Sequence, residues 1–184
     1  PAFFRRQRQM CIRDRLETGF EEMEIENPNG SPAIRGYNII AGKLSQSNDG
    51  NTFLSRNPAW LEDTVGEFPL STKEDVHEAL RAARSAFPSW AATPAPTRGQ
   101  VIGNMGRLLM ERKDDLVRLQ AREIGKTMKE CGGEIQEAID TCLFFQSEGR
   151  RLYGQTVNSE LPDKELFTYR RPLGAVSYTH LRAH

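Results

Sequence analysis

The stretch Ser71-Thr-Lys-Glu-Asp-Val-His-Glu-Ala-Leu-Arg-Ala-Ala-Arg-Ser-Ala-Phe-Pro-Ser-Trp90 opens the most regular part of the chain. It carries one stripe of apolar residues at helical spacing, namely Val76, Ala79, Leu80, Ala83 and Phe87. Ser71 and Glu74 fit a capping box, in which each side chain accepts a hydrogen bond from a free backbone N–H of the first turn. These features predict a helix that begins at Ser71 and ends or kinks at Pro88, because proline cannot supply a helical N–H.

Helical spacing continues as far as Tyr153. A second apolar face, interrupted by the charged run Glu111–Asp115, predicts two helices or one helix bent near residues 112–114. Gly125 is a suitable C-terminal cap, and a last long helix is expected from about Thr127 to Tyr153. The apolar residues that define these two faces are Val101, Ile102, Met105, Leu108 and Leu109, then Ile135, Ala138, Ile139, Cys142 and Phe145. Residues 71–153 are therefore predicted to form three or four helices.

Extended segments are predicted on both sides of this helical block. Tyr37–Ala41 and Thr52–Arg56 read as two strands, most simply paired as a β-hairpin over residues 37–58. Two strands alone are marginal in water, so such a hairpin must lie on something larger. Thr64–Phe68 is a third short extended segment, and the acidic, Asn/Pro/Gly-containing residues 16–36 favour a flexible lead-in.

The C-terminal part is also predicted to be extended. A loop covers Gln155–Lys164, and a strand follows over residues 166–171, ending before Pro172. Leu173–Val176 has the composition of the first residues of a buried strand.

Composition and charge exclude several classes of protein. Among 184 residues, 38% are hydrophobic and 27% are charged, and no apolar run is long enough for a membrane span. Residues 16–176 hold 19 basic and 24 acidic residues, which argues against a nucleic-acid partner. The three cysteines Cys11, Cys131 and Cys142 are too few and too scattered for a disulfide framework, so reduced thiols and a cytoplasmic location are expected.

Both ends differ from the rest of the chain. Residues 1–15 contain five arginines without a following apolar segment, and together with residues 177–184 they resemble translated sequencing adapters. Both are expected to be non-native tails, and they are excluded from the fold prediction.

Motifs that would identify a catalytic or binding site are incomplete. Gly125-Lys126-Thr127 lacks the earlier glycine of a phosphate loop, because Gln120 stands there. Gly99, Gly103 and Gly106 do not match the dinucleotide fingerprint, and they either allow close helix packing or are merely tolerated in the helix. His77 and the helical carboxylate pairs Asp114/Asp115 and Glu134/Glu137 are best explained as solvated groups. The sequence therefore predicts no catalytic, cofactor-binding or metal-ligating residue in this chain.

Seven short segments, in order, carry a resemblance that no single one would establish. They are Asn38–Lys43, Phe53–Pro58, Asp75–Trp90, Ala95–Arg98, Arg122–Thr127, Glu148–Gly154 and Arg170–Val176. Together they make residues 37–176 resemble the N-terminal part of an aldehyde dehydrogenase of the NAD(P)-dependent superfamily, with a leaning toward its aliphatic and semialdehyde branches.

The resemblance implies an α/β enzyme with a Rossmann-type cofactor domain, a catalytic domain with a Cys nucleophile, and a small sheet that joins subunits. The covered part would be mainly helical, with the hairpin of residues 37–58 in front and the first oligomerisation strand at 166–171. It also implies NAD or NADP as cofactor, an aldehyde or semialdehyde as substrate, and a homo-oligomer. The family's catalytic Asn, Glu and Cys would follow Val176, so the chain alone is expected to bind no cofactor and to be inactive.

Two other hypotheses stay open at this point. The chain could be a helical assembly or protein-interaction module without catalysis, which would melt cooperatively on its own. A fragment of an enzyme would instead expose the apolar stripes that lack their partners. Within the same superfamily, an acyl-CoA-forming member is the alternative to a semialdehyde-oxidising one.

Overall fold

The computed structural model describes residues 22–23, 27 and 30–177. The chain divides into two compact units, which are described separately. The sheet unit comprises Pro1–Glu78 and Arg118–Met128, and the helix unit comprises Ala79–Val117 and Lys129–His184. The strands are β1 (Glu22–Met23), β2 (Ala33–Arg35), β3 (Asn38–Ile40), β4 (Lys43–Ser45), β5 (Thr52–Arg56), β6 (Thr64–Pro69), β7 (Thr156–Val157) and β8 (Leu166–Phe167). The helices are α3 (Lys73–Ala92), α4 (Ala95–Glu111), α5 (Lys113–Ile124) and α6 (Met128–Glu148).

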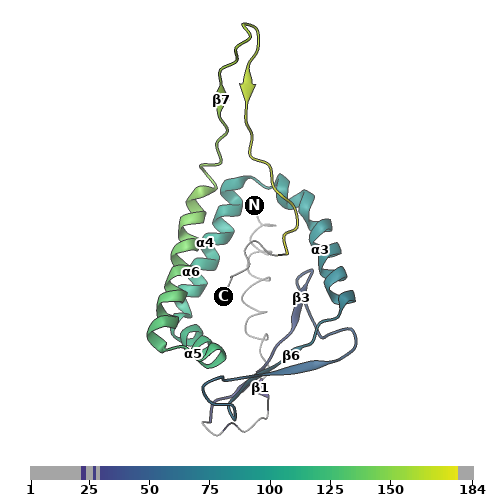
Figure 1. Cartoon of the computed structure of the whole chain (residues 1–184), viewed down its shortest axis with the longest axis vertical. Helices are drawn as coiled ribbons and strands as arrows, with labels where there is room; N and C mark the ends of the chain where they lie inside the picture. The colour runs from purple at the N-terminus through teal and green to yellow at the C-terminus, as the bar shows by residue number, and fades with distance from the viewer. Residues whose placement is uncertain (1–21, 24–26, 28–29, 178–184) are drawn as a thin grey trace, which may run out of the picture. The chain divides into compact units, whose positions relative to one another are not determined.

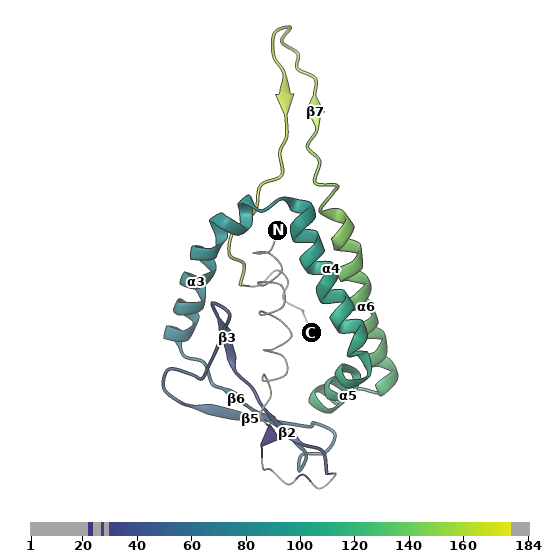
Figure 2. The same ribbon diagram turned by 180° about the vertical axis from the view of Figure 1, so that it is seen from behind.

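The main sheet of the sheet unit has the strand order β1-β2-β6-β5. The pair β2–β6 is parallel, and the pairs β1–β2 and β6–β5 are antiparallel. Figure 2 shows β2, β5 and β6 side by side in this sheet. Ala33 and Val65 are fully buried and form its small apolar centre. Phe53 and Phe68 face each other across β5 and β6, with ring centroids 5.8 Å apart.

The predicted hairpin over residues 37–58 is wrong in its pairing. β3 turns back at once and pairs with β4, Asn38 lying opposite Ser45, whereas β5 pairs with β6. The two turn residues Ala41 and Gly42 both have positive φ, at 52° and 74°. Such a turn matches the twist of the flanking strands and closes a tight hairpin. The sequence did not indicate this turn, because Ala-Gly stands where the typical signal is Asn-Gly. The third extended segment, predicted at 64–68, is confirmed as β6.

The flexible lead-in predicted for residues 16–36 is also wrong at the two places where the structure has strands. β1 and β2 lie within it, and Ala33 is fully buried. The composition of the segment is polar, but β2 obtains its backbone hydrogen bonds from β6, far along the chain. The predicted non-native tails, residues 1–15 and 177–184, lie outside the described residues except for Ser177.

The cap of helix α3 is Thr72, one residue later than the predicted cap Ser71. Thr72 and Asp75 form the capping pair: the Asp75 N–H donates to Thr72 Oγ1 at 3.3 Å, and the Thr72 N–H donates to Asp75 Oδ2 at 2.6 Å. Ser71 instead donates to the side chain of Asn38. Pro88 does not end the helix, which continues to Ala92.

The helix unit is held together by a close approach of α4 and α6, which lie side by side (Figure 1). Gly99, Gly103 and Gly106 are buried on the face of α4 toward α6. A Cβ on Gly99 would lie 2.5 Å from the carbonyl oxygen of Gln146, and one on Gly106 would lie 2.9 Å from Cys142 Cβ. The first alternative for these glycines, that they allow close helix packing, is confirmed.

The apolar faces predicted for α4 and α6 are covered only in part. Ile139 is fully buried and Cys142 is buried, but Val101, Met105 and Phe145 are about half exposed, at 48%, 48% and 53%. The expected exposure of unpartnered apolar stripes is therefore present in the helix unit.

The break between α4 and α5 falls at Arg112, which confirms the two-helix alternative. At the other end of α5, Gly125 has φ +67° and donates its N–H to the carbonyl of Ala121 at 2.9 Å. A Cβ there would lie 2.8 Å from Pro58 Cγ. The helix therefore ends in a left-handed glycine pressed against the loop after β5, as its predicted capping role requires.

A two-stranded arm follows α6 and projects beyond the end of that helix (Figure 1). Thr156 pairs with Phe167 and Val157 with Leu166, so part of the predicted loop 155–164 is strand. Residues 171–177 form no strand, contrary to the prediction for Leu173–Val176, and Leu173 is 95% exposed. A strand needs a neighbouring strand for its hydrogen bonds, and the described residues offer none there.

Among the described residues, no helix has the length and apolar character needed to cross a membrane.

Candidate functional site

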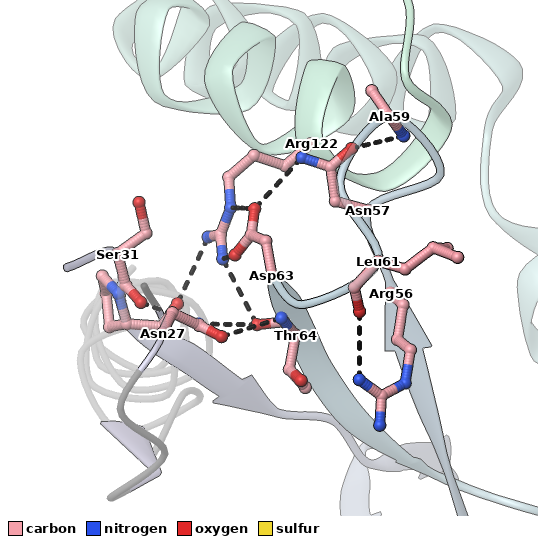
Figure 3. A network of polar contacts seen from close by, with 10 residues as sticks. Asn27, Ser31, Arg56, Asn57, Ala59, Leu61, Asp63, Thr64 and Arg122 are labelled. Carbon is pink, nitrogen blue, oxygen red and sulfur yellow. Dashed lines mark hydrogen bonds and ion pairs between the residues drawn. The ribbon is translucent and has the colours of Figure 1, made fainter. Parts of the chain in front are cut away.

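A buried ion pair lies at the centre of a polar cluster in the sheet unit (Figure 3). Asp63, fully buried, directly precedes β6, and Arg122 belongs to the last turn of α5. Arg122 Nη2 donates to Asp63 Oδ1 at 2.8 Å, and Arg122 Nε donates to Asp63 Oδ2 at 3.2 Å. This two-point geometry makes the pair both strong and specific in orientation.

The loop between β5 and β6 brings Asp63 to this position. The Asn57 N–H donates to the carbonyl of Asp63 at 2.9 Å, and the Asn57 side-chain amide donates to Asp63 Oδ2 at 3.1 Å. Asn57 Oδ1 accepts the N–H of Ala59 at 3.0 Å, which explains the turn at the Asn-Pro sequence. Asp63 Oδ2 therefore accepts from Asn57 as well as from Arg122.

A second amide side chain completes the cluster. Asn27 Oδ1 accepts the N–H of Thr64 at 2.7 Å, and Asn27 Nδ2 donates to the carbonyls of Thr64 and Ser31, both at 2.8 Å. The side chain thus bonds to Thr64 as a neighbouring strand would. Asn27 is buried, so these bonds satisfy polar atoms that would otherwise be costly.

A pocket of about 350 Å³ opens beside the ion pair. Arg118, Arg122 and Lys126 bring positive charge to its lining, and Asp63 brings the one carboxylate. The lining contains no Cys or His, and the Asp63 carboxylate is already engaged by Arg122 and Asn57. The cluster is therefore built to hold segments in place rather than to transfer protons.

The two carboxylates with resolved pKa shifts lie elsewhere in the sheet unit. The backbone N–H of Thr72 is the main cause that holds the pKa of Asp75 below its ordinary value, with hydrogen bonds from Thr72, Ser47 and Asn48 acting in the same direction against partial desolvation. For Asp49, the backbone N–H of Asn51 is the main cause of a lowered pKa. Both groups are turn or cap acceptors, ionised at neutral pH.

The thiols and the imidazole weighed in the sequence for catalytic chemistry differ in exposure. Cys131 and Cys142 are buried free thiols on α6, and His77 is exposed on α3. No group of three potential metal ligands occurs within the described ranges. That the chain contains no catalytic residue stays a prediction.

Sequence reasoning missed the ion pair. Arg122 entered only as part of the segment Arg122–Thr127, and Asp63 was not singled out. The partners are 59 residues apart, so no local periodicity links them. The sequence feature that could have indicated the pair was Arg122 itself, an arginine in the last turn of a helix shortly before its glycine cap Gly125.

Residues 45–179 match the sequence pattern of the aldehyde dehydrogenase family. The chain belongs to this family. The resemblance drawn from the seven segments is thereby confirmed.

Several aldehyde dehydrogenases of known activity are similar to the chain. It is 34% identical over 149 residues to the succinate-semialdehyde dehydrogenase [NADP(+)] of Escherichia coli (strain K12), covering 81% of this chain and 31% of that enzyme. It is 36% identical over 142 residues to malonate-semialdehyde dehydrogenase 1 of Geobacillus kaustophilus, covering 76% of this chain and 28% of that enzyme.

The fold is shared with solved structures as well. An NAD-dependent aldehyde dehydrogenase from Sinorhizobium meliloti superposes with a TM-score of 0.70 at 25% identity, over 80% of this chain and 30% of that one. An NADP-dependent enzyme of E. coli gives a TM-score of 0.68 at 35% identity, over 72% of this chain and 27% of that one. The expected relation to an α/β dehydrogenase is thereby confirmed. The chain spans about 30% of the length of these relatives.

The one glycine-lysine segment weighed as a phosphate loop does not have the geometry that the phosphates of a dinucleotide need. Gly125-Lys126-Thr127 follows the C-terminal end of α5, where the helix carries unpaired carbonyls and partial negative charge. A pyrophosphate binds at the opposite, N-terminal end of a helix that follows a strand.

Proposed function

We propose that this chain is the N-terminal part of an NAD(P)-dependent dehydrogenase that oxidises an aldehyde or semialdehyde to the corresponding acid. The observation that carries the proposal is the identity of 34% over 149 residues with a succinate-semialdehyde dehydrogenase. Other semialdehyde dehydrogenases, such as the malonate-semialdehyde enzyme, support the same substrate class. Either NAD or NADP is compatible, because the relatives include users of both.

In this proposal the chain contributes structure rather than chemistry. Cys131 is fully buried and Cys142 is only 6% exposed to solvent. Neither thiol is therefore placed to attack an aldehyde. The nucleophilic Cys, the water-activating Glu and the oxyanion-binding Asn are assigned to the part of the enzyme that follows Val176.

The reading frame of the source DNA beyond Val176 tests the proposal directly. A Pro-Trp-Asn segment is expected about ten residues on, as in the family, and a Gly-Gln-x-Cys segment much later. An open frame that lacks both would overturn the assignment.

An activity assay of the chain itself supplies an independent test. With succinic semialdehyde and either NAD⁺ or NADP⁺, we expect no formation of reduced nicotinamide and no saturable binding of the cofactor. Turnover that disappears in Cys131→Ser or Cys142→Ser would place the chemistry in this chain and contradict the proposal.

We also propose that the β7–β8 arm joins subunits of a homo-oligomer. Leu166–Phe167 is an edge strand, and Phe167 and Tyr169 are 52% and 76% exposed. An exposed strand edge with large apolar side chains is a ready partner for another sheet. Sedimentation of the enzyme with Phe167→Asp should show a smaller assembly than the unchanged enzyme, whereas an unchanged assembly would remove the arm from the interface.

A helical interaction module remains the alternative from another class. The half-exposed apolar side chains of the helix unit favour the dehydrogenase part. The chain should therefore bind a hydrophobic dye and aggregate on warming. A monodisperse chain that melts cooperatively without dye binding would favour the module. The cytoplasmic location expected from the free thiols belongs to the same proposal.

A further inference from the structure

Arg122 ties together three segments that are far apart in the sequence. Its Nε and Nη2 atoms bind the carboxylate of Asp63, Nη2 also donates to the carbonyl of Thr64 at 3.3 Å, and Nη1 donates to the carbonyl of Pro32 at 3.2 Å. One side chain from the last turn of α5 therefore contacts the start of β6 and the residue just before β2. All three of its nitrogen atoms are engaged.

The pair has a strong reason to stay closed. The side chain of Asp63 is fully buried, and that of Arg122 is only 19% exposed. Removal of one partner leaves a buried charge without compensation, which is far less favourable than the absence of both charges. The Asp63 carboxylate thus remains in place only while Arg122 is docked.

Asn27 fastens the N-terminal segment to the same point from the other side. It bonds to both the N–H and the carbonyl of Thr64, and to the carbonyl of Ser31. The Thr64 carbonyl therefore accepts from Asn27 at 2.8 Å and from Arg122 at 3.3 Å. Asn27 therefore binds Thr64 and Ser31, while Arg122 of α5 binds Thr64 and Pro32.

We propose that the Arg122–Asp63 pair is a conformational latch, which makes the docking of residues 30–36 and of the C-terminal turn of α5 on β6 one cooperative event. When the latch is closed, the parallel pair β2–β6 and the end of α5 are held together. When it opens, both segments detach together. The contact of Pro58 with Gly125 belongs to the same docked turn.

Cooperativity distinguishes a latch from a set of separate contacts. If the contacts were separate, loss of Asn27 would loosen the N-terminal segment and leave α5 unchanged. In a latch, loss of Asn27 also loosens residues 118–126, although the two do not touch in the described contacts. Local opening of this kind is read out by amide hydrogen exchange.

The experiment is hydrogen exchange by mass spectrometry on the full chain and its Asn27→Ala and Arg122→Met variants, with Arg84→Met as the matched control. Arg84 is an exposed arginine on α3. Both test variants should speed exchange at residues 30–36 and at 118–126 by about tenfold or more, while residues 135–146 of α6 stay unchanged. The control should exchange like the unchanged chain.

Two results would overturn the latch. In one, Asn27→Ala speeds exchange at residues 30–36 but not at 118–126. In the other, every segment of the chain exchanges faster to the same degree, which would show global loosening.

A double-mutant cycle keeps the proposal testable if Asn27→Ala is too unstable to measure, because the cycle uses only variants of Asp63 and Arg122. Asp63→Asn with Arg122→Met removes both charges, so the double variant should exchange more slowly at both segments than Arg122→Met alone. Additive effects of the two changes would count against the latch.

Discussion

The segments within each of the two units are held together in different ways, by a side-chain ion pair in the sheet unit and by close backbone packing in the helix unit. In the sheet unit, the end of α5 is held to β6 by atoms that are present, above all the guanidinium of Arg122 and the carboxylate of Asp63. In the helix unit, α4 packs closely on α6 because Gly99, Gly103 and Gly106 have no side chain, which lets the two backbones approach. Truncation of a side chain should therefore destabilise the sheet unit, whereas addition of a side chain at one of these glycines should destabilise the helix unit.

The largest effect is expected at the ion pair. Asp63→Ala leaves Arg122 without its carboxylate partner and removes the acceptor of the Asn57 side-chain amide. The free energy of unfolding of the sheet unit should fall by about 3–5 kcal/mol, the usual range for a broken buried pair. Urea denaturation measures it, and Glu62→Ala, an exposed neighbour, should change stability by less than about 0.5 kcal/mol. Equal effects of the two variants would mean that Asp63 does not hold the sheet unit together.

In the helix unit, addition of one methyl group should be the damaging change. Gly99→Ala places a Cβ 2.5 Å from the carbonyl oxygen of Gln146, a backbone atom that cannot yield without a shift of the helix. The expected loss is about 1–3 kcal/mol. Gly133→Ala is the matched control, since nothing lies within 4 Å of its Cβ.

That control should act in the opposite direction. Alanine is favoured over glycine inside a helix by about 1 kcal/mol, so Gly133→Ala should raise the stability of α6. Thermal melting followed by circular dichroism compares the two variants. A stabilising Gly99→Ala would refute the close approach of α4 and α6.

Gly125 combines a left-handed backbone with a close neighbour. Gly125→Ala forces a side chain into φ +67° and toward Pro58, at a cost of about 1–2 kcal/mol from the backbone alone. Gly50→Ala, at φ +73° with nothing within 4 Å, isolates the backbone contribution. The stability of the Gly125 variant should therefore fall further than that of the Gly50 variant, and equal losses would mean that the Pro58 contact has no energetic weight.

A smaller effect is expected from pH at the start of α3. The pKa of Asp75 is lowered on folding, chiefly by the Thr72 N–H, so its contribution to stability is present above its ordinary value of 3.8 and is lost as the pH falls through the folded value. Asp75→Asn should reduce this acid sensitivity. Urea midpoints measured from pH 5 downward test it, and an unchanged slope in the variant would contradict the assignment.

The smallest effect concerns the apolar side chains that the described contacts leave uncovered. Leu173 is 95% exposed, so Leu173→Ser should change the free energy of unfolding by less than about 0.5 kcal/mol. Phe145→Ser, at a half-exposed residue of α6, should lower dye binding more than Leu173→Ser does, because it belongs to a wider apolar surface. Identical dye binding would mean that this surface is not a continuous patch.

The helical block was predictable because helical spacing is local. Ile139 and Cys142 of the predicted α6 face are buried, and Gly125 ends α5 as expected. The family could be recognised for a different reason, since seven short segments recur in a fixed order. Neither kind of signal depends on which distant segments meet.

The sheet could not be predicted in the same way. The partner of β5 was decided by the tight turn at Ala41-Gly42, which takes β3 away, and by the later β6. β2 lies in a segment of polar composition that does not resemble a strand. It is a strand because it pairs with residues near Gly66, far along the chain. The Asp63–Arg122 pair depends on the same long-range pairing, so the candidate site could not be reached from local patterns.

The sheet unit is discontinuous in the sequence, and this has a consequence for synthesis on the ribosome. Asp63 is made 59 residues before Arg122. At about 5–20 residues per second, roughly 3–12 seconds pass between the synthesis of Asp63 and that of Arg122, while residues 64–122 are translated. The first part of the nascent chain is therefore made with an Asp63 carboxylate that does not yet have its Arg122 partner. Completion of this unit is timed by the translation of α5.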